Sequence, residues 1–430
     1  MLNVAKRLVD NEKGYVDRRI YTDLDIYQQE LEQVWGRCWI GIGHTSQVPH
    51  PNDFFAAYIA EDPILVTRDS RGNLHAFLNM CRHRGNRICR ADLGNTQSFM
   101  CTYHGWTFSP DGKLVGVPGY KEAYFEELDR SQWGLVEARC DSYKGLIFAN
   151  WDQSAPSLVD YLGDMAWYLD VQLDRRAGGT ELLAGVQKHM MGTNWKIAAD
   201  NTSGDSYHFP ITHGSALSLR RSTSKPGLNT DPNTVHVYAG NGHCVMNRYI
   251  GPSREVSEGL TPVVMEYFKQ HAEEMRQRVG EIRARQNIGL GNIFPATAYH
   301  SSPALRLRIP RGPLKTEEWT YCLVDKDAPE EVKTALRRSH TSSFGPAGLV
   351  EMDDANNWSQ VTNSGLIREA RKQPMNFQLG LGRQVTSEAL PGALTATVTE
   401  TNQRAFYGFW AEMMDAASWG QVRLSPTTRS

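Results

Sequence analysis

The sequence predicts an α+β protein with two domains, a first domain of short strands and a second domain in which strands and helices are mixed. The chain has 430 residues, of which 40% are hydrophobic and 22% are charged, so it is long enough for two or three domains with sizeable cores. The pattern of apolar residues changes twice, near residues 38 and 157. We therefore expect an N-terminal segment over 1–37, a β domain over 38–157 and an α+β domain over 158–430.

The N-terminal segment contains one amphipathic stretch. Thr22 or Asp23 can cap the start of a helix there. The stretch places four apolar residues at helical spacing: Ile26, Tyr27, Leu31 and Val34. We expect this helix to pack on the second domain.

Short runs of β-type residues between Pro, Gly, Asn and Asp predict the strands of the first domain. The clearest runs span 39–42, 54–59, 63–68, 74–78 and 146–150. In the second domain we expect helices over 158–171, 262–285, 329–340 and 346–372, and strands over 235–238, 305–309, 318–324 and 404–410. This alternation is typical of an α+β domain.

Two short motifs in the β domain each pair a cysteine with a histidine. They are Cys81-Arg-His83 and Cys101-Thr-Tyr-His104, and a glycine that allows a sharp turn follows each motif within two residues. Two thiolates on one iron and two neutral imidazoles on the other form a Rieske [2Fe–2S] cluster, whose potential is about −150 to +300 mV. We therefore predict that these two cysteines and two histidines are cluster ligands.

A structural zinc site also uses two cysteines and two histidines, and it is the alternative for these motifs. Zinc fingers group the two cysteines in one motif and the two histidines in another, whereas each motif here holds one residue of each kind. The grouping favours the iron–sulfur cluster.

A second set of metal-binding residue types lies between Asn194 and His213. His208 and His213 can supply two imidazoles of the facial triad by which non-haem Fe(II) oxygenases hold iron, with a carboxylate as third ligand. Residues five apart diverge by about 140° on an unbroken helix, but Pro210 can end or bend the helix between them. Ordinary hydrogen-bonding histidines are the alternative for this pair.

The third ligand is expected far along the chain, at Asp353 or Asp354. At 100° per residue, Asp354 shares its helical face with Val350 and Trp358, whereas Asp353 lies on a more polar face. A carboxylate on an apolar face is costly unless it is paired or binds a metal. We predict Asp354 as the iron ligand, with a buried ion pair to an arginine as the alternative.

Asp205 precedes His208 by three residues, so the two side chains would be neighbours on a helix. Its carboxylate can accept the proton from the ring nitrogen that does not bind iron. A solvated charge on a helix is the alternative interpretation of Asp205.

The composition excludes several function classes. A net charge of −2 without basic runs predicts no nucleic-acid binding. No run of about 18 apolar residues and no signal-peptide core occur, so we expect a cytoplasmic protein without membrane segments. The seven cysteines are scattered and odd in number, which favours a reducing compartment over a disulfide framework.

Together, the two Cys/His motifs, the stretch from Asn194 to His213 and the stretch from Glu351 to Trp358 closely resemble the Rieske non-haem iron ring-hydroxylating dioxygenases, large (α) subunit. The resemblance covers nearly the whole chain. It implies a Rieske β domain followed by a helix-grip catalytic domain, in which helices pack on an antiparallel sheet and mononuclear Fe(II) is bound. It also implies site residues by motif position: iron ligands His208, His213 and Asp354, and catalytic residues Asn201 and Asp205.

The resemblance further implies partners and a reaction. α subunits of this family form trimers, often with a small β subunit as α₃β₃, in which the cluster of one subunit serves the iron of its neighbour through His104 and Asp205. Electrons are expected from NADH through a reductase and usually a ferredoxin, with O₂ as co-substrate. The expected reaction adds both oxygen atoms to a polycyclic or biaryl hydrocarbon to give a cis-dihydrodiol.

The substrate pocket is less well defined by the sequence. The stretch from Pro310 to Asp325 resembles the subgroup that oxidises benzene-type, biphenyl-type and polycyclic hydrocarbons, but Thr202 stands where those enzymes usually carry a bulky apolar residue. The expected pocket residues are Thr202, Phe209, Leu217, Leu219, Phe294, His300, Leu305 and Leu307. Arg306 and Arg308 lie on the strand face opposite the two leucines of that strand, where they could bind a substrate carboxylate, face solvent or form structural ion pairs.

Two other functions remain open at this point. The chain could be a ring hydroxylase that keeps both metals but acts on a polar aromatic acid of the phthalate or salicylate type. It could also be a Rieske electron carrier whose second domain only binds a partner. The products of an ¹⁸O₂ experiment separate the first alternative from ring dioxygenation, and the presence of one iron type only would indicate the second.

Overall fold

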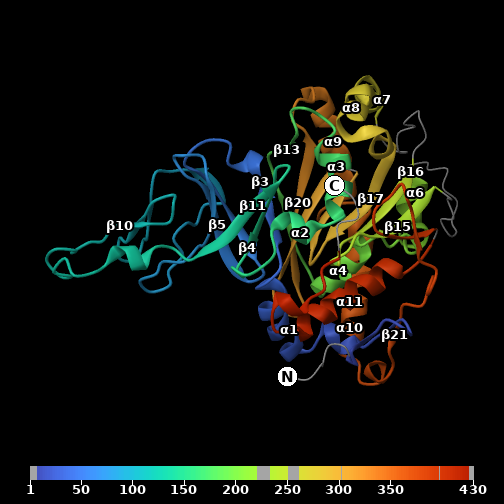
Figure 1. Ribbon diagram of the computed structural model, residues 1–430, viewed down its shortest axis with the longest axis horizontal. Coiled ribbons are helices and arrows are strands. Elements are labelled where there is room, and N and C mark those ends of the chain that lie inside the picture. The colour runs from blue at the N-terminus through green and yellow to red at the C-terminus, as the bar shows by residue number, and fades with distance from the viewer. Residues whose placement is uncertain (1–6, 220–232, 250–260, 302, 397, 426–430) are drawn as a thin grey trace. The chain divides into compact units, whose positions relative to one another are not determined.

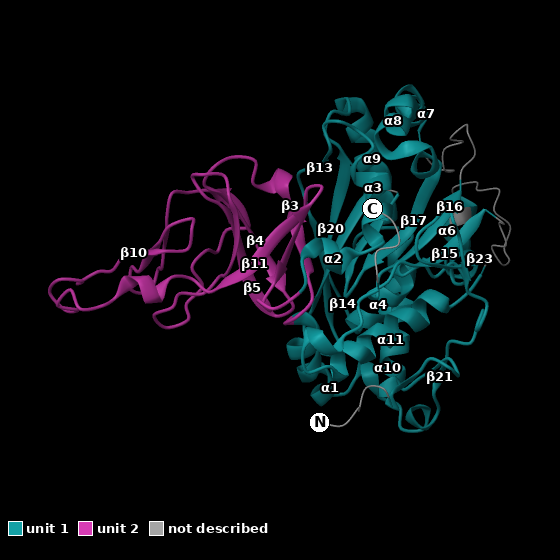
Figure 2. Ribbon diagram, in the orientation of Figure 1, with its two compact units in different colours: residues 1–35, 156–430 teal, residues 36–155 magenta. Residues whose placement is uncertain are grey.

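The computed structural model describes residues 7–219, 233–249, 261–301, 303–396 and 398–425 of the chain (Figure 1). It divides into two compact units: unit 1 contains residues 1–35 and 156–430, and unit 2 contains residues 36–155 (Figure 2). The N-terminal segment therefore belongs to the same unit as residues 156–430. The mixture of helices and antiparallel sheets confirms the predicted α+β class.

Unit 2 consists mainly of antiparallel strands. Seven of them form a sheet in the order β3-β12-β11-β6-β5-β4-β7, and three form a smaller sheet in the order β10-β9-β8. In chain order these strands are β3 (Ile40–His44), β4 (Asp53–Ile59), β5 (Asp62–Arg68), β6 (Leu74–Leu78), β7 (Leu93–Asn95), β8 (Phe99–Met100), β9 (Thr107–Phe108), β10 (Leu114–Gly116), β11 (Glu137–Tyr143) and β12 (Leu146–Asn150). Aromatic side chains such as Phe77, Trp106 and Phe108 form the core next to the two Cys/His motifs.

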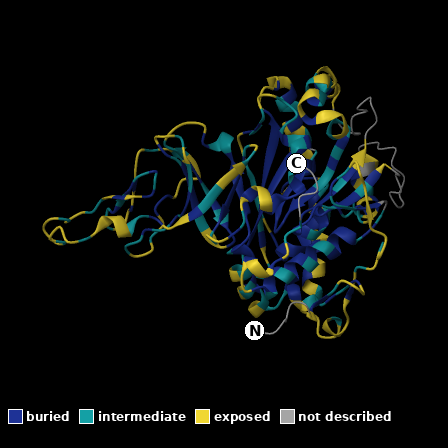
Figure 3. Cartoon of the chain, viewed as in Figure 1, coloured by how far each residue is buried: buried dark blue, intermediate teal, exposed yellow. Residues whose placement is uncertain are grey.

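The large sheet of unit 1 has the order β13-β20-β19-β18-β17-β16-β15-β23-β22, and β14 also pairs with β20. Its strands are β13 (Thr180–Leu182), β14 (Gln187–Met191), β15 (Thr234–Tyr238), β16 (Cys244–Tyr249), β17 (Gln286–Ile293), β18 (Thr297–His300), β19 (Ala304–Pro310), β20 (Thr316–Asp325), β22 (Val385–Thr386) and β23 (Ala393–Ala396). A small sheet joins β1 (Val9–Asp10), β2 (Tyr15–Val16) and β21 (Met375–Asn376). Figure 3 shows that the large sheet is mostly buried.

Helices pack around this sheet. They are α1 (Leu24–Glu30), α2 (Leu158–Leu162), α3 (Met165–Leu173), α4 (Trp195–Thr202), α5 (Phe209–Thr212), α6 (Gly214–Leu219), α7 (Pro262–Gln270), α8 (Ala272–Ala284), α9 (Glu330–Ser343), α10 (Glu351–Ser364) and α11 (Thr401–Asp415). α4 packs on β17, β18 and β19 and also contacts α10 and α11, whereas α3 packs on β17 and α8. Within the described ranges, no helix has the length and apolar character that crossing a membrane requires.

Asp23 caps α1, since its side chain accepts hydrogen bonds from the backbone N–H groups of Asp25 and Ile26. The helix expected over 158–171 is divided into α2 and α3 by Gly163, whose φ of +50° lies in the region that favours glycine. The strand expected over 404–410 is wrong, because these residues lie within α11. Nearly every side of that helix is buried, so its sequence lacks the polar face by which an amphipathic helix is recognised.

A buried ion pair joins α1 to the rest of unit 1. Glu30 accepts hydrogen bonds from Lys196 Nζ at 2.5 Å, from Trp195 Nε1 at 2.9 Å and from Trp410 Nε1 at 2.8 Å. Neither Glu30 nor Lys196 is exposed to solvent. Burial lowers the pKa of Lys196, and the negative charge of Glu30 opposes that shift. One carboxylate thus connects α1, α4 and α11.

The substitution Lys196→Met should destabilise unit 1, because Glu30 would remain buried without its cation. Removal of one partner of a buried pair costs about 3–5 kcal/mol, which corresponds to a fall in melting temperature of roughly 10 °C. Thermal unfolding followed by circular dichroism measures this shift. The double variant Glu30→Gln/Lys196→Met should recover part of it, since it removes the unpaired buried charge and its one amide oxygen still accepts from one indole N–H. An unchanged melting temperature in the single variant would contradict the prediction.

Candidate metal sites

The two Cys/His motifs form loops of the same conformation in unit 2. The N–H of Cys81 donates to the carbonyl of Asn86, and the N–H of Cys101 donates to the carbonyl of Trp106, both at 2.8 Å. In each loop a glycine N–H donates back to the cysteine carbonyl at 2.9 Å. These glycines have φ values of +77° and +73°, which a residue with a side chain rarely adopts. The repeat presents one thiol and one imidazole from each loop.

The side chains of these loops suit a Rieske cluster. Cys81 and Cys101 are buried, and the rings of His83 and His104 lie 4.5 Å apart. The ring of His83 stacks on Trp106, and its buried Nδ1 has no hydrogen-bond partner among the described residues. Burial, and then the neighbouring His104, lower the pKa of His83, which favours the neutral form of the ring that binds metal. Two buried thiols and two imidazoles are the donor set of the cluster.

In unit 1 the structure brings His208, His213 and Asp354 together. The Nε2 atoms of the two histidines are 3.2 Å apart, and Asp354 Oδ1 lies 3.4 Å from His208 Nε2 and 3.3 Å from His213 Nε2. Their candidate ligand atoms all lie within 4.8 Å of one another. Asp354 Oδ1 is buried and has no hydrogen-bond partner in the described part of the chain. Two imidazoles and one carboxylate oxygen without a donor fit a mononuclear Fe(II) ion.

A helix of one turn sets the spacing of the two histidines. His208 precedes α5 and His213 follows it, with Pro210 in the first turn. Proline is tolerated there because its missing N–H would have no helical partner in any case. Pro210 therefore begins a short helix and does not break a longer one, and the histidines at its two ends converge.

Helical periodicity separates the two aspartates of α10. The side chain of Asp354 is 8% exposed, whereas that of Asp353 is 42% exposed. Asp353 Oδ2 lies 4.0 Å from Nδ1 of His213, on the side of the ring away from Asp354. The inward face of α10 thus presents Asp354 to both histidines.

Asp205 contacts His208 from a turn. α4 ends at Thr202, so the expected helical placement of Asp205 is wrong, although the two side chains are neighbours. Asp205 Oδ2 lies 3.2 Å from His208 Nδ1, and its Oδ1 accepts the backbone N–H of Tyr207 at 2.9 Å. Burial opposes its ionisation, but the hydrogen bond and charge of His208 hold the pKa of Asp205 below its usual value. Asn201 Nδ2 lies 3.3 Å from the same ring nitrogen.

A cavity of about 220 Å³ lies beside these residues. Its lining includes Asp200, which the sequence did not identify as a site residue. Asp200 Oδ2 accepts from Tyr407 Oη at 2.9 Å, and the hydroxyl groups of Tyr407 and Tyr21 are 2.6 Å apart. Burial, and then the charge of Asp205, raise the pKa of Asp200 well above its usual value. The pKa values of two aspartates five residues apart are therefore shifted in opposite directions. The tyrosines come from segments too distant to form a motif with them.

The expected substrate residues are not brought together as one group. Phe209 lies with its ring 5.4 Å from that of His213, while Leu219 is exposed and the side chain of Leu217 falls outside the described residues. Phe294 is buried against Phe406 and Phe409 of α11.

The remaining residues expected in the substrate pocket lie on the two opposite faces of the sheet at β19. Leu305 pairs across the sheet with Tyr299, which contacts Met165 of α3, so Leu305 and Leu307 face α3. The opposite face carries Arg308, whose Nη1 donates to Thr202 Oγ1 at 2.7 Å.

His300 lies on that opposite face too, since it pairs with Ala304. Its ring lies 5.3 Å from that of Phe344. Burial, and then the charges of Arg306 and His340, lower the pKa of His300 to about 3.

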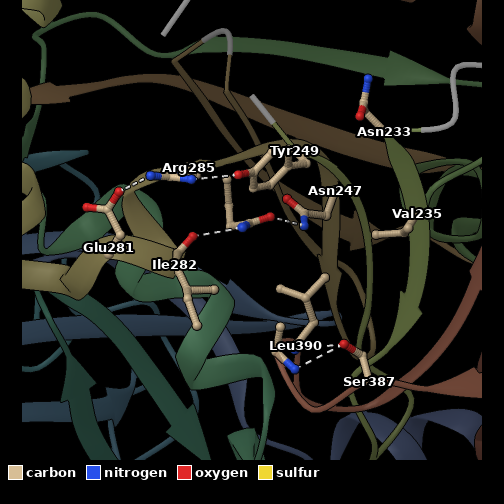
Figure 4. Close-up of a pocket in the computed structure, with 11 residues that line it drawn as sticks. Asn233, Val235, Asn247, Tyr249, Glu281, Ile282, Arg285, Ser387 and Leu390 are labelled. Atoms are coloured by element: carbon tan, nitrogen blue, oxygen red, sulfur yellow. Dashed lines mark hydrogen bonds and ion pairs between the residues drawn. The ribbon is translucent and has the colours of Figure 1, made fainter. Parts of the chain in front are cut away.

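A larger cavity, of about 420 Å³, lies elsewhere in unit 1 (Figure 4). In Figure 4 the guanidinium of Arg285 lies between Glu281 and the hydroxyl of Tyr249. The other residues that line this larger cavity are Asn233, Val235, Asn247, Ile282, Gln286, Ser387, Ala389 and Leu390. None of the metal-site or expected substrate residues lines this cavity.

Comparisons with known proteins cover both units. Residues 38–132 match the Rieske [2Fe-2S] domain, and residues 159–416 match the ring hydroxylating alpha subunit (catalytic domain). The biphenyl dioxygenase subunit alpha of Paraburkholderia xenovorans (strain LB400) is 39% identical, over 97% of this chain and 94% of that protein. The large oxygenase component of the naphthalene 1,2-dioxygenase system of Pseudomonas fluorescens is 35% identical, over 99% of this chain and 100% of that protein.

A solved structure shows the same architecture. A point mutant of naphthalene 1,2-dioxygenase bound to phenanthrene superposes with a TM-score of 0.92 at 32% sequence identity, over 98% of this chain and 97% of that chain. Together, these matches confirm the resemblance that the motifs indicate. The chain belongs to the α subunits of the Rieske non-haem iron ring-hydroxylating dioxygenases.

Proposed function

We propose that this chain is the terminal oxygenase α subunit of a multicomponent dioxygenase that converts a hydrocarbon of two or three aromatic rings to a cis-dihydrodiol. The observation that carries this proposal is the triad of His208, His213 and Asp354 in a chain that also has the cluster loops. When bound, the iron supplies the site of dioxygen activation and the cluster supplies electrons. Relatives named for biphenyl, benzene and naphthalene support the choice of a hydrocarbon.

The protein side chains have separate tasks in this proposal. His208 and His213 would hold the iron through Nε2 and Asp354 would hold it through one oxygen, which would leave other coordination positions open for small molecules. Asp205 holds the ring of His208 through Nδ1, which fixes the ring orientation and leaves Nε2 as the ligand atom. Asn201 borders the same ring and is proposed to assist in this orientation.

The contacts of the two arginines on β19 favour a hydrocarbon substrate over an aromatic acid. Arg308 Nε donates to Glu318 at 2.7 Å, and Arg306 Nη1 lies 3.3 Å from Glu351. Each guanidinium therefore already faces a carboxylate of the protein. Phe209, next to His213, is the apolar residue that we place in the substrate pocket, and we leave out Phe294, Leu305 and Leu307 because they face other elements.

The relatives are subunits of multicomponent systems, and we propose a small β subunit, a ferredoxin and an NADH-dependent reductase as partners. We further propose an α₃β₃ assembly in which Asp205 meets His104 of a neighbouring subunit. Exposed apolar side chains near both centres support an interface at each of them: Tyr103 beside His104, and Tyr207 and Ile211 near His208.

The reaction itself is tested by product analysis. The purified protein, with a reductase and a ferredoxin, should convert naphthalene and biphenyl to cis-dihydrodiols in which both oxygen atoms come from ¹⁸O₂, as mass spectrometry would show. Incorporation of one labelled atom only, or turnover restricted to phthalate-type or salicylate-type acids, would contradict ring dioxygenation of a hydrocarbon.

The iron ligands are tested one at a time. His208→Ala, His213→Ala and Asp354→Ala should each remove the mononuclear iron and abolish turnover while the visible spectrum of the cluster stays unchanged, because the two ligand sets lie in different units. Asp353→Ala is the matched control and should retain iron, since its side chain faces outward. Metal analysis and optical spectra measure both centres. A larger loss of iron in the Asp353 variant would show that the other carboxylate is the ligand.

The role of Asp205 is tested by a single turnover. In Asp205→Asn the cluster should still be reducible and the iron largely bound, but reoxidation of the cluster by O₂ and substrate should slow by more than about 100-fold, beyond the usual effect of a residue that orients a ligand. Stopped-flow absorbance follows the cluster. Reoxidation at the rate of the unmodified protein would show that Asp205 does not connect the two centres.

A further inference from the structure

Helices α4 and α10 run beside the proposed iron site and are linked at several points. Where α4 begins, the backbone N–H of Asn194 donates to Oγ1 of Thr362, near the end of α10, at 2.9 Å. The other end of α4 is Thr202, and the two helices contact each other. The segment with both histidines follows α4, so the spacing of α4 and α10 determines where Asp354 lies relative to His208 and His213.

Arg308 connects the two helices from the sheet. Its Nη1 donates to Thr202 Oγ1 at 2.7 Å, and its guanidinium carbon lies 5.7 Å from the ring centre of Trp358, a distance typical of a cation–π contact. Trp358 follows Asp354 by one helical turn. The third contact of Arg308, from Nε to Glu318 Oε2 at 2.7 Å, holds the guanidinium on the sheet. One side chain of β19 thus touches the last residue of α4 and the turn of α10 next to the carboxylate.

Arg306 connects the sheet to α10 on the other side of Asp354. Its Nη1 lies 3.3 Å from Oε1 of Glu351, which precedes Asp354 by three residues, and its guanidinium lies 4.2 Å from the ring centre of Phe344. Glu351 Oε2 also accepts the backbone N–H of Gly345 at 3.2 Å. Arg306 and Arg308 are two residues apart on one strand face, so they reach α10 one turn before and one turn after Asp354.

These groups lie in the protein interior, where charges carry a large desolvation cost. Arg306, Arg308, Glu318 and Glu351 are all nearly or fully buried. Burial opposes the ionisation of Glu318, but the charge of Arg308 lowers its pKa to about 2, whereas burial raises the pKa of Glu351 well above its usual value. Buried ion pairs add little net stability compared with apolar side chains of similar volume. Their contribution here is the geometry that their directional contacts impose.

We propose that Arg306 and Arg308 are positioning residues of the iron site, which hold α10 against α4 and the sheet so that Asp354 meets His208 and His213. This inference rests on the iron ligands of the proposed function. It assigns the two arginines a role in metal binding without contact to metal or substrate.

The test uses the double variant Arg308→Met/Glu318→Met in the full-length protein. It removes the contacts to Thr202 and Trp358 together with the carboxylate that would otherwise lose its partner, and it leaves Arg306 in contact with Glu351. The Fe(II) affinity, measured by competition with a chromophoric chelator, should fall about 10-fold or more. The near-infrared circular dichroism bands of bound Fe(II) should shift or broaden, and the cluster spectrum should stay unchanged.

Two further variants separate positioning from a general loss of packing. Arg308→Lys keeps a cation for Glu318 but lacks the planar fork that reaches two helices at once, so its iron affinity should lie between those of the unmodified protein and the double variant. The control, Arg175→Met/Asp325→Asn, removes another largely buried ion pair of unit 1, in which Arg175 Nε and Asp325 Oδ1 are 2.7 Å apart. It should bind iron as tightly as the unmodified protein.

The outcomes are distinct. Iron affinity and circular dichroism bands equal to those of the unmodified protein in the double variant would overturn the positioning role and leave the proposed function intact. If the double variant does not fold, the comparison of Arg308→Lys with the control decides, and equal iron affinities overturn the inference. If His208→Ala binds Fe(II) as tightly as the unmodified protein, the proposed iron site is wrong and this inference fails with it.

Discussion

The architecture of unit 1 depends on one costly arrangement, a carboxylate oxygen held in the interior beside two imidazoles. Asp354 Oδ1 has no hydrogen-bond donor among the described residues, so its burial is favourable only with a cation next to it. The one-turn helix α5 places His208 and His213 at converging ends, and α10 turns its apolar face toward them. The histidines and the aspartate come from distant parts of the chain, and α4, which precedes the histidines, packs on the sheet and contacts α10.

Other buried charged groups in unit 1 also determine where helices pack, although they add little net stability. Glu30 is satisfied by one ammonium group and two indole N–H groups from different helices, which defines where α1 packs. The cluster of Arg306, Arg308, Glu318 and Glu351 similarly makes contacts that apolar side chains could not direct. If a partner moved away, the charge left behind would be buried without compensation and would destabilise the fold. The helices can therefore occupy only a narrow range of positions.

Motifs whose residues are close in the sequence could be interpreted without a structure. The cluster loops are an example, because each loop supplies a thiol and an imidazole within four residues and a glycine for the turn. Periodicity also sufficed to place Asp354 on the inner face of α10. The partners of Arg306 and Arg308 could not be predicted, because the pairing of β19 with β20 depends on a strand register that no local pattern encodes. The strand prediction over 404–410 fails because α11 is buried on nearly all sides. Apolar character also does not reveal which neighbour a side chain faces, so the sequence could not predict that Phe294 packs on α11.

The insertion of unit 2 between Trp35 and Pro156 has a consequence for the order in which the protein matures. Every residue of unit 2 has been synthesised once Ala155 emerges, so this unit can fold and acquire its cluster while most of the chain is still missing. Unit 1 cannot complete its fold until much later, because Glu30 and Tyr21 form hydrogen bonds with Trp410 and Tyr407, which are synthesised near the end of the chain. Synthesis from the N-terminus therefore completes the segment that carries the cluster ligands well before the segments that unit 1 needs to close.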